Sequence, residues 1–244
     1  MFDSDGEGNG PQTFGIMVYG DSTGAVSNNY VEEFSRGGIG VNGDDGALPD
    51  PDMIVEGNEI HGNGLEDADV WVADPGYWKS NWWAENGIQI GWGATGAVLD
   101  NEVYDCRCNN PKWGSSGIMN YNGVDEIIGN YVENCDLNIY VNTVSEIRCN
   151  EVDGNGQWGI MDYSTGSTIE ENRVHDAYAG IYTLGASTIR YNDIHDNDYG
   201  ILVNDATCGA VVNYNSIAGN GYGLYNYHTS DIDATENWWG DASG

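Results

Sequence analysis

Basic residues are almost absent from this sequence. The 244 residues include only 7 Lys and Arg against 39 Asp and Glu, which gives a formal net charge of −32 at pH 7. A chain with this charge is repelled by nucleic acid and by anionic membranes, so neither is an expected partner. Because salt screens self-repulsion, we expect an acidic, halophilic surface of the kind found in haloarchaea. The alternative is a secreted protein surrounded by divalent cations.

Proline and long apolar runs are also scarce. Five Pro accompany 36 Gly, a ratio that favours many short elements joined by tight turns. No apolar run approaches the length of a membrane span, so we expect no membrane insertion. The first residues lack the basic start and apolar core of a signal peptide. Nine Trp and sixteen Tyr nevertheless supply ample surface to bury, which argues against disorder.

An apolar-x-x-Asn-x-apolar unit recurs along the chain. Its Asn stands at positions 29, 58, 101, 130, 150, 172, 192, 215 and 237. Most copies are followed by a second signal, a Gly-Ile or Gly-Leu pair such as Gly159-Ile160. A period of about 22 residues with short apolar alternations is typical of a parallel β-solenoid. Because Asn tolerates the left-handed backbone region, we expect it at a corner, with its amides stacked in a ladder.

These coils, and the closing Glu236-Asn237-Trp238-Trp239-Gly240, resemble the parallel β-helix repeats of carbohydrate-active and copper-chaperone-like secreted families. The resemblance covers residues 15–240. It implies an all-β fold, a single-stranded right-handed parallel β-helix of about nine to ten coils. It also implies an extracellular or cell-surface location. The Asp-Pro-His of alginate epimerases and the Gly-His-Gly of polygalacturonases are absent.

The repeat also sets the expected domain organisation. We expect an acidic Gly-rich segment over 1–14, the β-helix over 15–240 and a tail over 241–244. Insertions interrupt the repeat at 42–52, 64–86 and 106–115. Long loops on a rigid scaffold often carry function.

Stacking makes each offset from the anchor Asn a column along the axis. Arg148, Glu170 and Arg190 share one column and Glu151, Arg173 and Asp193 another, so we expect ladders of alternating charge. The other cations, Arg36, Lys79, Arg107 and Lys112, fall between an anchor Asn and its Gly-Ile pair. Trp78, Trp82, Trp83 and Trp113 lie in the insertions among them. These eight residues are the predicted polysaccharide-binding wall, since Trp stacks on sugars and cations meet uronate or sulfate groups. The alternative is that these Trp fold the loop back as a lid.

A column of titratable residues lies three positions after the anchor Asn. His61, Tyr104, Glu133 and Asp153 are its candidate catalytic residues, able to remove and return a proton at a uronate C5. The alternative is a set of polar residues that solvate a turn. Further along the column, His175 and His195 stand beside Asp176 and Asp196, a pattern that could hold a transition metal. Because the pattern repeats at a fixed offset, no metal site is predicted there.

An apolar column follows the Gly-Ile pairs. Its outward-facing members are Met119, Tyr140, Met161, Tyr182, Leu202 and Tyr225. An exposed stripe of this kind marks an interface or a stacking platform. We expect contact with a second copy of the chain or with neighbouring domains of the same surface protein, and sugar stacking is the alternative.

Cysteines and possible cofactors complete the sequence pattern. Five Cys leave one unpaired, and Cys106 and Cys135 fall in one column, where a disulfide and two free thiols are both sterically reasonable. No cofactor is expected, although the alternating oxygens of Asp3-Ser4-Asp5 leave calcium open.

The sequence therefore predicts an extracellular β-helix that binds an anionic polysaccharide. If it is an enzyme, the expected activity is that of a lyase, an epimerase or a glycoside hydrolase. The rival hypothesis is a non-catalytic structural or adhesive module, part of a larger surface protein or fibre.

Overall fold

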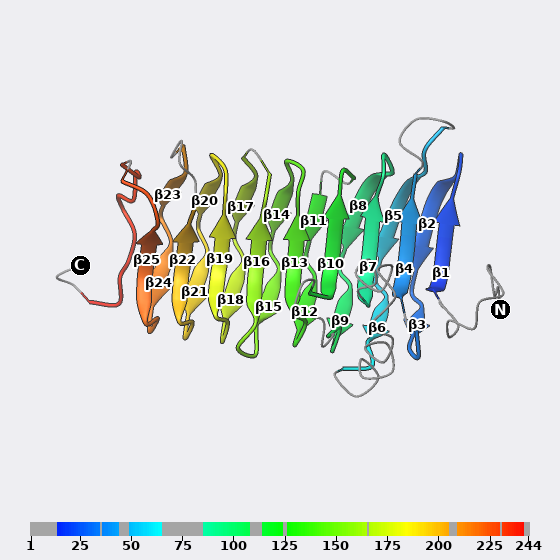
Figure 1. The fold of residues 1–244 in the computed structure, drawn as a ribbon, viewed down its shortest axis with the longest axis horizontal. Helices are drawn as coiled ribbons and strands as arrows, with labels where there is room; N and C mark the ends of the chain where they lie inside the picture. Colours follow the sequence, from blue (N-terminus) through cyan, green and yellow to red (C-terminus); the bar gives the residue numbers. More distant parts are fainter. Residues whose placement is uncertain are drawn as a thin grey trace, which may run out of the picture.

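The chain forms a straight rod of stacked coils, as the repeat predicts (Figure 1). The computed structural model describes residues 14–34, 36–43, 49–64, 85–107, 114–123, 126–164, 166–204, 209–229 and 231–241. All strand pairs within the three sheets are parallel, and each strand pairs with the strand three places along the chain. The fold is the predicted right-handed parallel β-helix. Among the described residues there is no helix long and apolar enough to span a membrane.

Each coil contributes one strand to each of three sheets, which we call A, B and C. Sheet A contains β1 (Phe14–Tyr19), β4 (Gly37–Asn42), β7 (Asn86–Gly91), β10 (Ser116–Tyr121), β13 (Leu137–Val141), β16 (Trp158–Asp162), β19 (Ala179–Thr183), β22 (Tyr199–Val203) and β25 (Tyr222–Asn226). Sheet B contains β2 (Thr23–Ser27), β5 (Asp52–Glu56), β8 (Thr95–Leu99), β11 (Glu126–Ile128), β14 (Glu146–Arg148), β17 (Thr168–Glu170), β20 (Thr188–Arg190) and β23 (Val211–Asn213). Sheet C contains β3 (Tyr30–Val31), β6 (Glu59–His61), β9 (Glu102–Tyr104), β12 (Tyr131–Glu133), β15 (Glu151–Asp153), β18 (Arg173–His175), β21 (Asp193–His195) and β24 (Ser216–Ala218).

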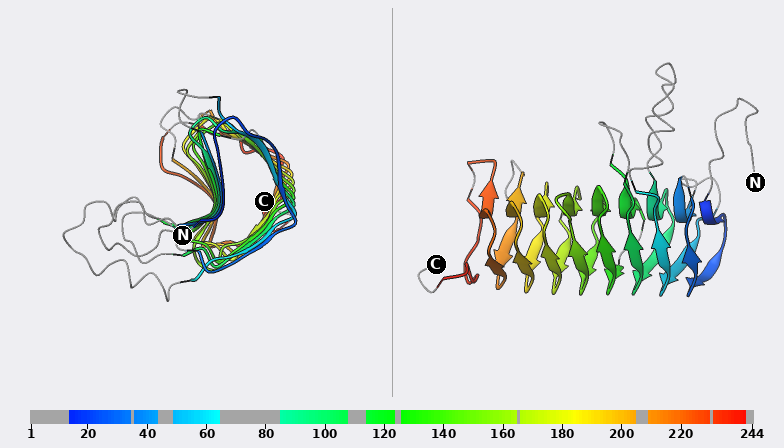
Figure 2. Two further views of the ribbon diagram at one scale, coloured as in Figure 1. Left: turned by 90° about the vertical axis from the view of Figure 1, so that its right-hand side faces the viewer. Right: turned by 90° about the horizontal axis from the view of Figure 1, so that it is seen from below.

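The core is a set of aliphatic columns inside the coils. In sheet A the central column reads Ile39, Ile88, Ile118, Ile139, Ile160, Ile181 and Ile201, all essentially without solvent contact. Burial of one such side chain contributes about 1.5–3 kcal/mol. Sheet A bends inward where sheets B and C bulge outward, as the view along the axis shows (Figure 2).

The anchor Asn residues form the expected ladder. Asn150 Nδ2 donates to Asn172 Oδ1 at 2.9 Å, and Asn150 Oδ1 accepts from Asn130 Nδ2 at 3.0 Å. The same side-chain link joins every pair of neighbouring anchors from Asn29 to Asn237. Each interior anchor also satisfies backbone groups that a corner would otherwise leave without partners.

The prediction that the anchor Asn itself adopts the left-handed conformation is wrong. The residue before it does so: Gly129 has φ 72°, Cys149 φ 56° and Glu171 φ 57°. The anchor instead keeps an ordinary φ, so that its amide points along the axis to the next anchor. The corner therefore requires the Asn side chain for hydrogen bonding and places the backbone strain on its neighbour.

The Gly of the Gly-Ile pair is explained by close approach of the backbones. A Cβ added to Gly159 would overlap the carbonyl oxygen of Gly180 in the next coil. Asn138 is the variant at this position, and its amide donates to the carbonyl of Trp158 at 2.8 Å.

The predicted charge ladders are confirmed in two of three cases. Arg190 pairs with Glu170 at 2.6 Å and Arg173 with Glu151 at 3.0 Å, both between neighbouring coils. Arg148 instead pairs with Glu146 of its own strand at 2.9 Å, because residues two apart in a strand point to the same side. These pairs are exposed to solvent and contribute little to stability.

Candidate metal site and aromatic face

Most of the predicted polysaccharide-binding wall lies outside the described residues. This holds for Lys79, Lys112, Trp78, Trp82, Trp83 and Trp113. The other two members are described and contact their own surroundings. The Arg36 guanidinium lies 5.4 Å from the Phe14 ring centroid, and burial lowers the pKa of Arg36. As sugar ligands, all eight stay a prediction.

Arg107 is held by the coil that follows it. Its Nε lies 3.6 Å from Asp136 Oδ1, and its Nη1 donates to Asn134 Oδ1 at 3.3 Å. The guanidinium is thus already balanced by a carboxylate, which weakens its attraction for an anionic ligand.

The four candidate catalytic residues do share one column. On sheet C, His61 pairs in register with Tyr104, Tyr104 with Glu133, and Glu133 with Asp153. The rings of His61 and Tyr104 stack at 4.8 Å with an interplanar angle of 18°. The column is a surface of sheet C, and its catalytic role stays a prediction.

Neighbouring carboxylates already occupy the polar ends of this column. His61 Nε2 lies 2.8 Å from Glu59 Oε1, and Tyr104 donates its hydroxyl to Glu102 at 2.7 Å. Burial and the Glu102 carboxylate raise the pKa of Tyr104 well above its ordinary value. A phenol held in this way is a poor base or acid near neutral pH.

The same column continues into a cluster of metal-ligating groups. Strand β18 ends at His175, and Asp176 then takes a left-handed φ of 54°, which turns its carboxylate back onto its neighbour. Asp176 Oδ2 lies 2.8 Å from His175 Nδ1. Asp153 precedes His175 in the column, and one ligand atom from each of the three residues lies within 4.8 Å of the others. We call Asp153, His175 and Asp176 the His175 cluster.

The second nitrogen of His175 has no hydrogen-bond partner in the described part of the chain. This nitrogen is Nε2, and the imidazole is largely buried. Its nearest carboxylate oxygen is Glu151 Oε1, at 3.8 Å. His195 of the next coil stacks on His175 with ring centroids 5.1 Å apart. His195 differs because its Nε2 accepts from Arg173 Nε at 3.3 Å.

The donor set of the His175 cluster suits a transition metal. One imidazole and two carboxylates are N and O donors of the kind that Cu²⁺ and Zn²⁺ accept, and among divalent first-row ions such sites bind Cu²⁺ most tightly. If His175 Nδ1 and the Asp176 carboxylate held a metal ion, the neutral imidazole would carry its proton on Nε2. The Glu151 carboxylate is then its natural partner, and such a second carboxylate usually orients a ligating histidine.

A second feature lies on the outer side of sheet A, in the C-terminal half. We call it the aromatic face; it comprises Tyr140, Trp158, Tyr163, Tyr178, Tyr182, Tyr199, Tyr222, Tyr225 and Tyr227. Each ring contacts another at 5.0–5.9 Å between centroids, so that the set is continuous. Sequence reasoning from one column found only Tyr140, Tyr182 and Tyr225, because the other rings stand at different offsets.

The predicted apolar stripe is one column in register, but it is not evenly exposed. Met119, Tyr140, Met161, Tyr182, Leu202 and Tyr225 follow one another along sheet A. Met161, Tyr182 and Leu202 are only 6%, 7% and 1% exposed, because Trp158, Tyr199 and their neighbours pack over them. The exposed layer is therefore aromatic, and the aliphatic groups lie beneath it. Its role as a protein interface stays a prediction.

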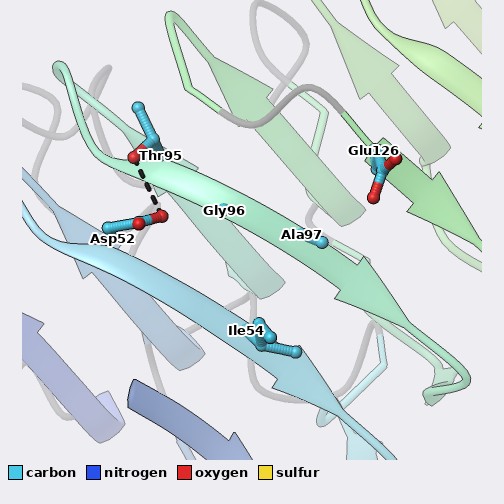
Figure 3. A pocket seen from close by; sticks show the side chains of 6 residues that line it. All are labelled: Asp52, Ile54, Thr95, Gly96, Ala97 and Glu126. Carbon is cyan, nitrogen blue, oxygen red and sulfur yellow. Dashed lines mark hydrogen bonds between the residues drawn. The ribbon is translucent and has the colours of Figure 1, made fainter. Parts of the chain in front are cut away.

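An open depression marks the outer side of sheet B (Figure 3). It is lined by Asp52, Ile54, Thr95, Gly96, Ala97 and Glu126. Thr95 Oγ1 donates to Asp52 at 3.1 Å. These six residues include two carboxylates and no cation. The depression arises because Thr95, Gly96 and Ala97 have small side chains, and it is not an enclosed cavity.

Cys106 and Cys135 are buried free thiols in neighbouring coils. Their mutual hydrogen bond and burial raise the pKa of Cys106 well above its ordinary value. The sequence allows either a disulfide or two free thiols at these positions, and the structure has the two free thiols.

Comparison with known proteins gives one match. A family model described as NosD, periplasmic copper-binding protein, matches residues 72–239, which is more than half of the chain. No curated protein and no solved structure matches it. The matched segment contains the His175 cluster and the aromatic face.

Proposed function

Because this chain belongs to the NosD family of periplasmic copper-binding proteins, we propose that it is a β-helix protein of the cell envelope that binds copper at the His175 cluster. The observation that carries the proposal is the convergence of the His175 imidazole with the Asp153 and Asp176 carboxylates at the end of strand β18. The expectation of no metal cofactor does not agree with the description of the family.

The charges around the cluster favour a divalent cation. The net charge of −32 raises the local concentration of cations over the whole surface. Glu151 adds a carboxylate near His175, while Arg173, which pairs with Glu151, opposes a cation. Bound copper would supply a Lewis acid and a one-electron redox couple, and the chain's own part is to hold the ion and orient the imidazole.

We expect the His175 cluster to account for a copper site with nitrogen coordination. Titration of the protein with Cu²⁺, followed by calorimetry and electron paramagnetic resonance in excess Ca²⁺, should show one tight site with nitrogen hyperfine structure. Calcium occupies surface carboxylates without competing for imidazole. His175→Ala should weaken this site by at least about tenfold, since it removes the only nitrogen ligand of the cluster. A chelator should reverse the binding.

His195→Ala is the matched control. It removes the stacked imidazole of the next coil, whose Nε2 accepts from Arg173, and leaves Asp153, His175 and Asp176 in place. Copper binding should survive in this variant. Equal copper affinity in wild type and His175→Ala would show that the ion binds elsewhere.

Polysaccharide binding is the second candidate function, and the observation that favours it is the aromatic face. Tyr and Trp rings offer apolar planes for the C–H faces of sugars and polar groups at their edges. Cleavage or epimerisation by His61, Tyr104, Glu133 and Asp153 stays a prediction. A location outside the cell or at its surface, rather than elsewhere in the cell envelope, is also a proposal.

A further inference from the structure

The aromatic face carries no charge. Strands β13, β16, β19, β22 and β25 each place two residues on the outer side of sheet A: Leu137 and Tyr140, Trp158 and Met161, Ala179 and Tyr182, Tyr199 and Leu202, Tyr222 and Tyr225. None is acidic or basic. In a chain with 39 acidic residues, ten uncharged outer positions over five successive coils are unexpected for a solvent-exposed surface; the exposed Asp198, just before Tyr199, lies at their border.

We infer that the aromatic face binds an uncharged polysaccharide that runs along the rod axis. This inference rests on the second candidate function, polysaccharide binding, and changes its substrate class from an anionic to a neutral glycan. The exposed layer consists of rings with hydroxyl groups, and the aliphatic Met161 and Leu202 are covered. A sugar requires flat rings with polar edges, and Tyr supplies both.

The charge distribution excludes a polyanion from this surface. Among the described residues the outer positions of these five strands offer no Lys or Arg to pair with a carboxylate or sulfate. The net charge of the chain repels a polyanion at long range. A neutral glycan needs no cation to pair with, and the net charge of the chain does not repel it.

The spacing of the rings fits a linear repeating ligand. Neighbouring coils are about 4.8 Å apart, which is on the order of the length of one sugar residue. Tyr178 contacts Tyr199 at 5.5 Å, and Tyr199 stacks on Tyr222 at 5.1 Å and 12°. A chain of sugars along the axis therefore passes one ring per coil, and because Tyr199 and Tyr222 stack face to face, these two rings present their edges to it.

Polar groups at the edge of the face can fix the orientation of a sugar. Asn204 Nδ2 donates to the Tyr182 hydroxyl at 2.9 Å, which fixes that phenol at the edge of the face. Tyr140 and Tyr163 carry their phenolic protons at neutral pH, as an ordinary Tyr does, and burial raises the pKa of both further. Neutral hydroxyl donors and acceptors match the hydroxyl groups of an uncharged sugar.

The test compares neutral and charged glycans on the full chain. Hydroxyethylcellulose, laminarin and a galactomannan are the neutral probes, and polygalacturonate and alginate are the anionic ones, in affinity electrophoresis and calorimetry at high salt. We expect retention by at least one neutral glycan and by neither anionic one. Tyr222→Ala/Tyr225→Ala should weaken retention by at least about tenfold, because it removes two exposed stacking rings.

Tyr214→Ala is the matched control. Tyr214 stacks on Tyr191 at 5.4 Å and 16°, much as Tyr222 stacks on Tyr199, and Tyr214 and Tyr222 are 50% and 57% exposed. Tyr214 follows strand β23 of sheet B, so its loss should leave glycan retention unchanged. Circular dichroism checks that both variants fold.

Three other outcomes would contradict the inference, and each leads to a different conclusion. Retention of only the anionic glycans leaves polysaccharide binding standing and rejects the neutral substrate class. Retention of no glycan rejects both. A concentration-dependent oligomer that Tyr222→Ala/Tyr225→Ala dissolves, without glycan binding, identifies the face as an interface between copies of the chain.

Discussion

Asn150→Ala should destabilise the protein by about 3–5 kcal/mol. Asn150 is 2% exposed and lies in the middle of the ladder. Its Nδ2 donates to the Ile127 carbonyl at 2.9 Å, and its Oδ1 accepts the backbone N–H of Asn130 at 2.9 Å. Alanine leaves these two backbone groups buried without partners, and each costs about 1–3 kcal/mol. The measurement is urea unfolding followed by circular dichroism.

Asn29→Ala is the control within the same ladder. Asn29 is its first member and is only half-buried, and no described residue donates to its Oδ1. We expect a loss of about 1 kcal/mol there. A similar loss at both positions would mean that the ladder does not act as a buried hydrogen-bonded column.

Gly96→Ala should cost about 3 kcal/mol or more, because two penalties add. Gly96 has a left-handed φ of 125°, and a Cβ there would come into direct overlap with the carbonyl oxygen of Met53 in the preceding coil. Neither group can move without shifting a strand of sheet B. Thermal unfolding of the variant measures the loss.

Gly24→Ala separates the two penalties. Gly24 pairs with Met53 from the other side and has a φ of 147°, but nothing lies within 4 Å of an added Cβ. Its replacement should therefore show the backbone penalty alone, about 1–2 kcal/mol. If the two alanine variants unfold at the same temperature, close packing of the coils is not what fixes glycine at position 96.

The sequence predicted the fold in detail because each coil repeats the same physical requirements. An aliphatic side chain such as Ile147 must face the interior, and the anchor Asn150 must satisfy the corner. The register of the coils follows from this period. The predicted column that contains His61 and Tyr104 is therefore present on sheet C. The left-handed residue was misplaced by one position, since Gly, Cys and Glu all occupy it and leave no common residue type.

The candidate sites were harder to find because they depend on contacts between different offsets. Trp158 and Tyr178 stand in different columns, and their rings nevertheless meet at 5.0 Å. The His175 cluster depends on the turn at Asp176, which directs a carboxylate at its own neighbour. Position along the chain shows that His175 and His195 share a column, but not that only His195 Nε2 has a hydrogen-bond partner.

The two proposed sites use the regular coils in different ways. The His175 cluster is one modified corner on sheet C, whereas the aromatic face needs five coils in register on sheet A. His175→Ala should therefore leave the aromatic face unchanged, and Tyr222→Ala/Tyr225→Ala should leave the His175 cluster unchanged, since the substituted residues lie in different coils and share no contact.

Copper-edge anomalous diffraction from crystals soaked in Cu²⁺ tests the assignment of the copper site most directly. We expect the strongest anomalous peak beside the His175 imidazole, within ligand distance of the Asp153 and Asp176 carboxylates. A strongest peak at His61, His228 or Cys149, with none beside His175, would contradict it.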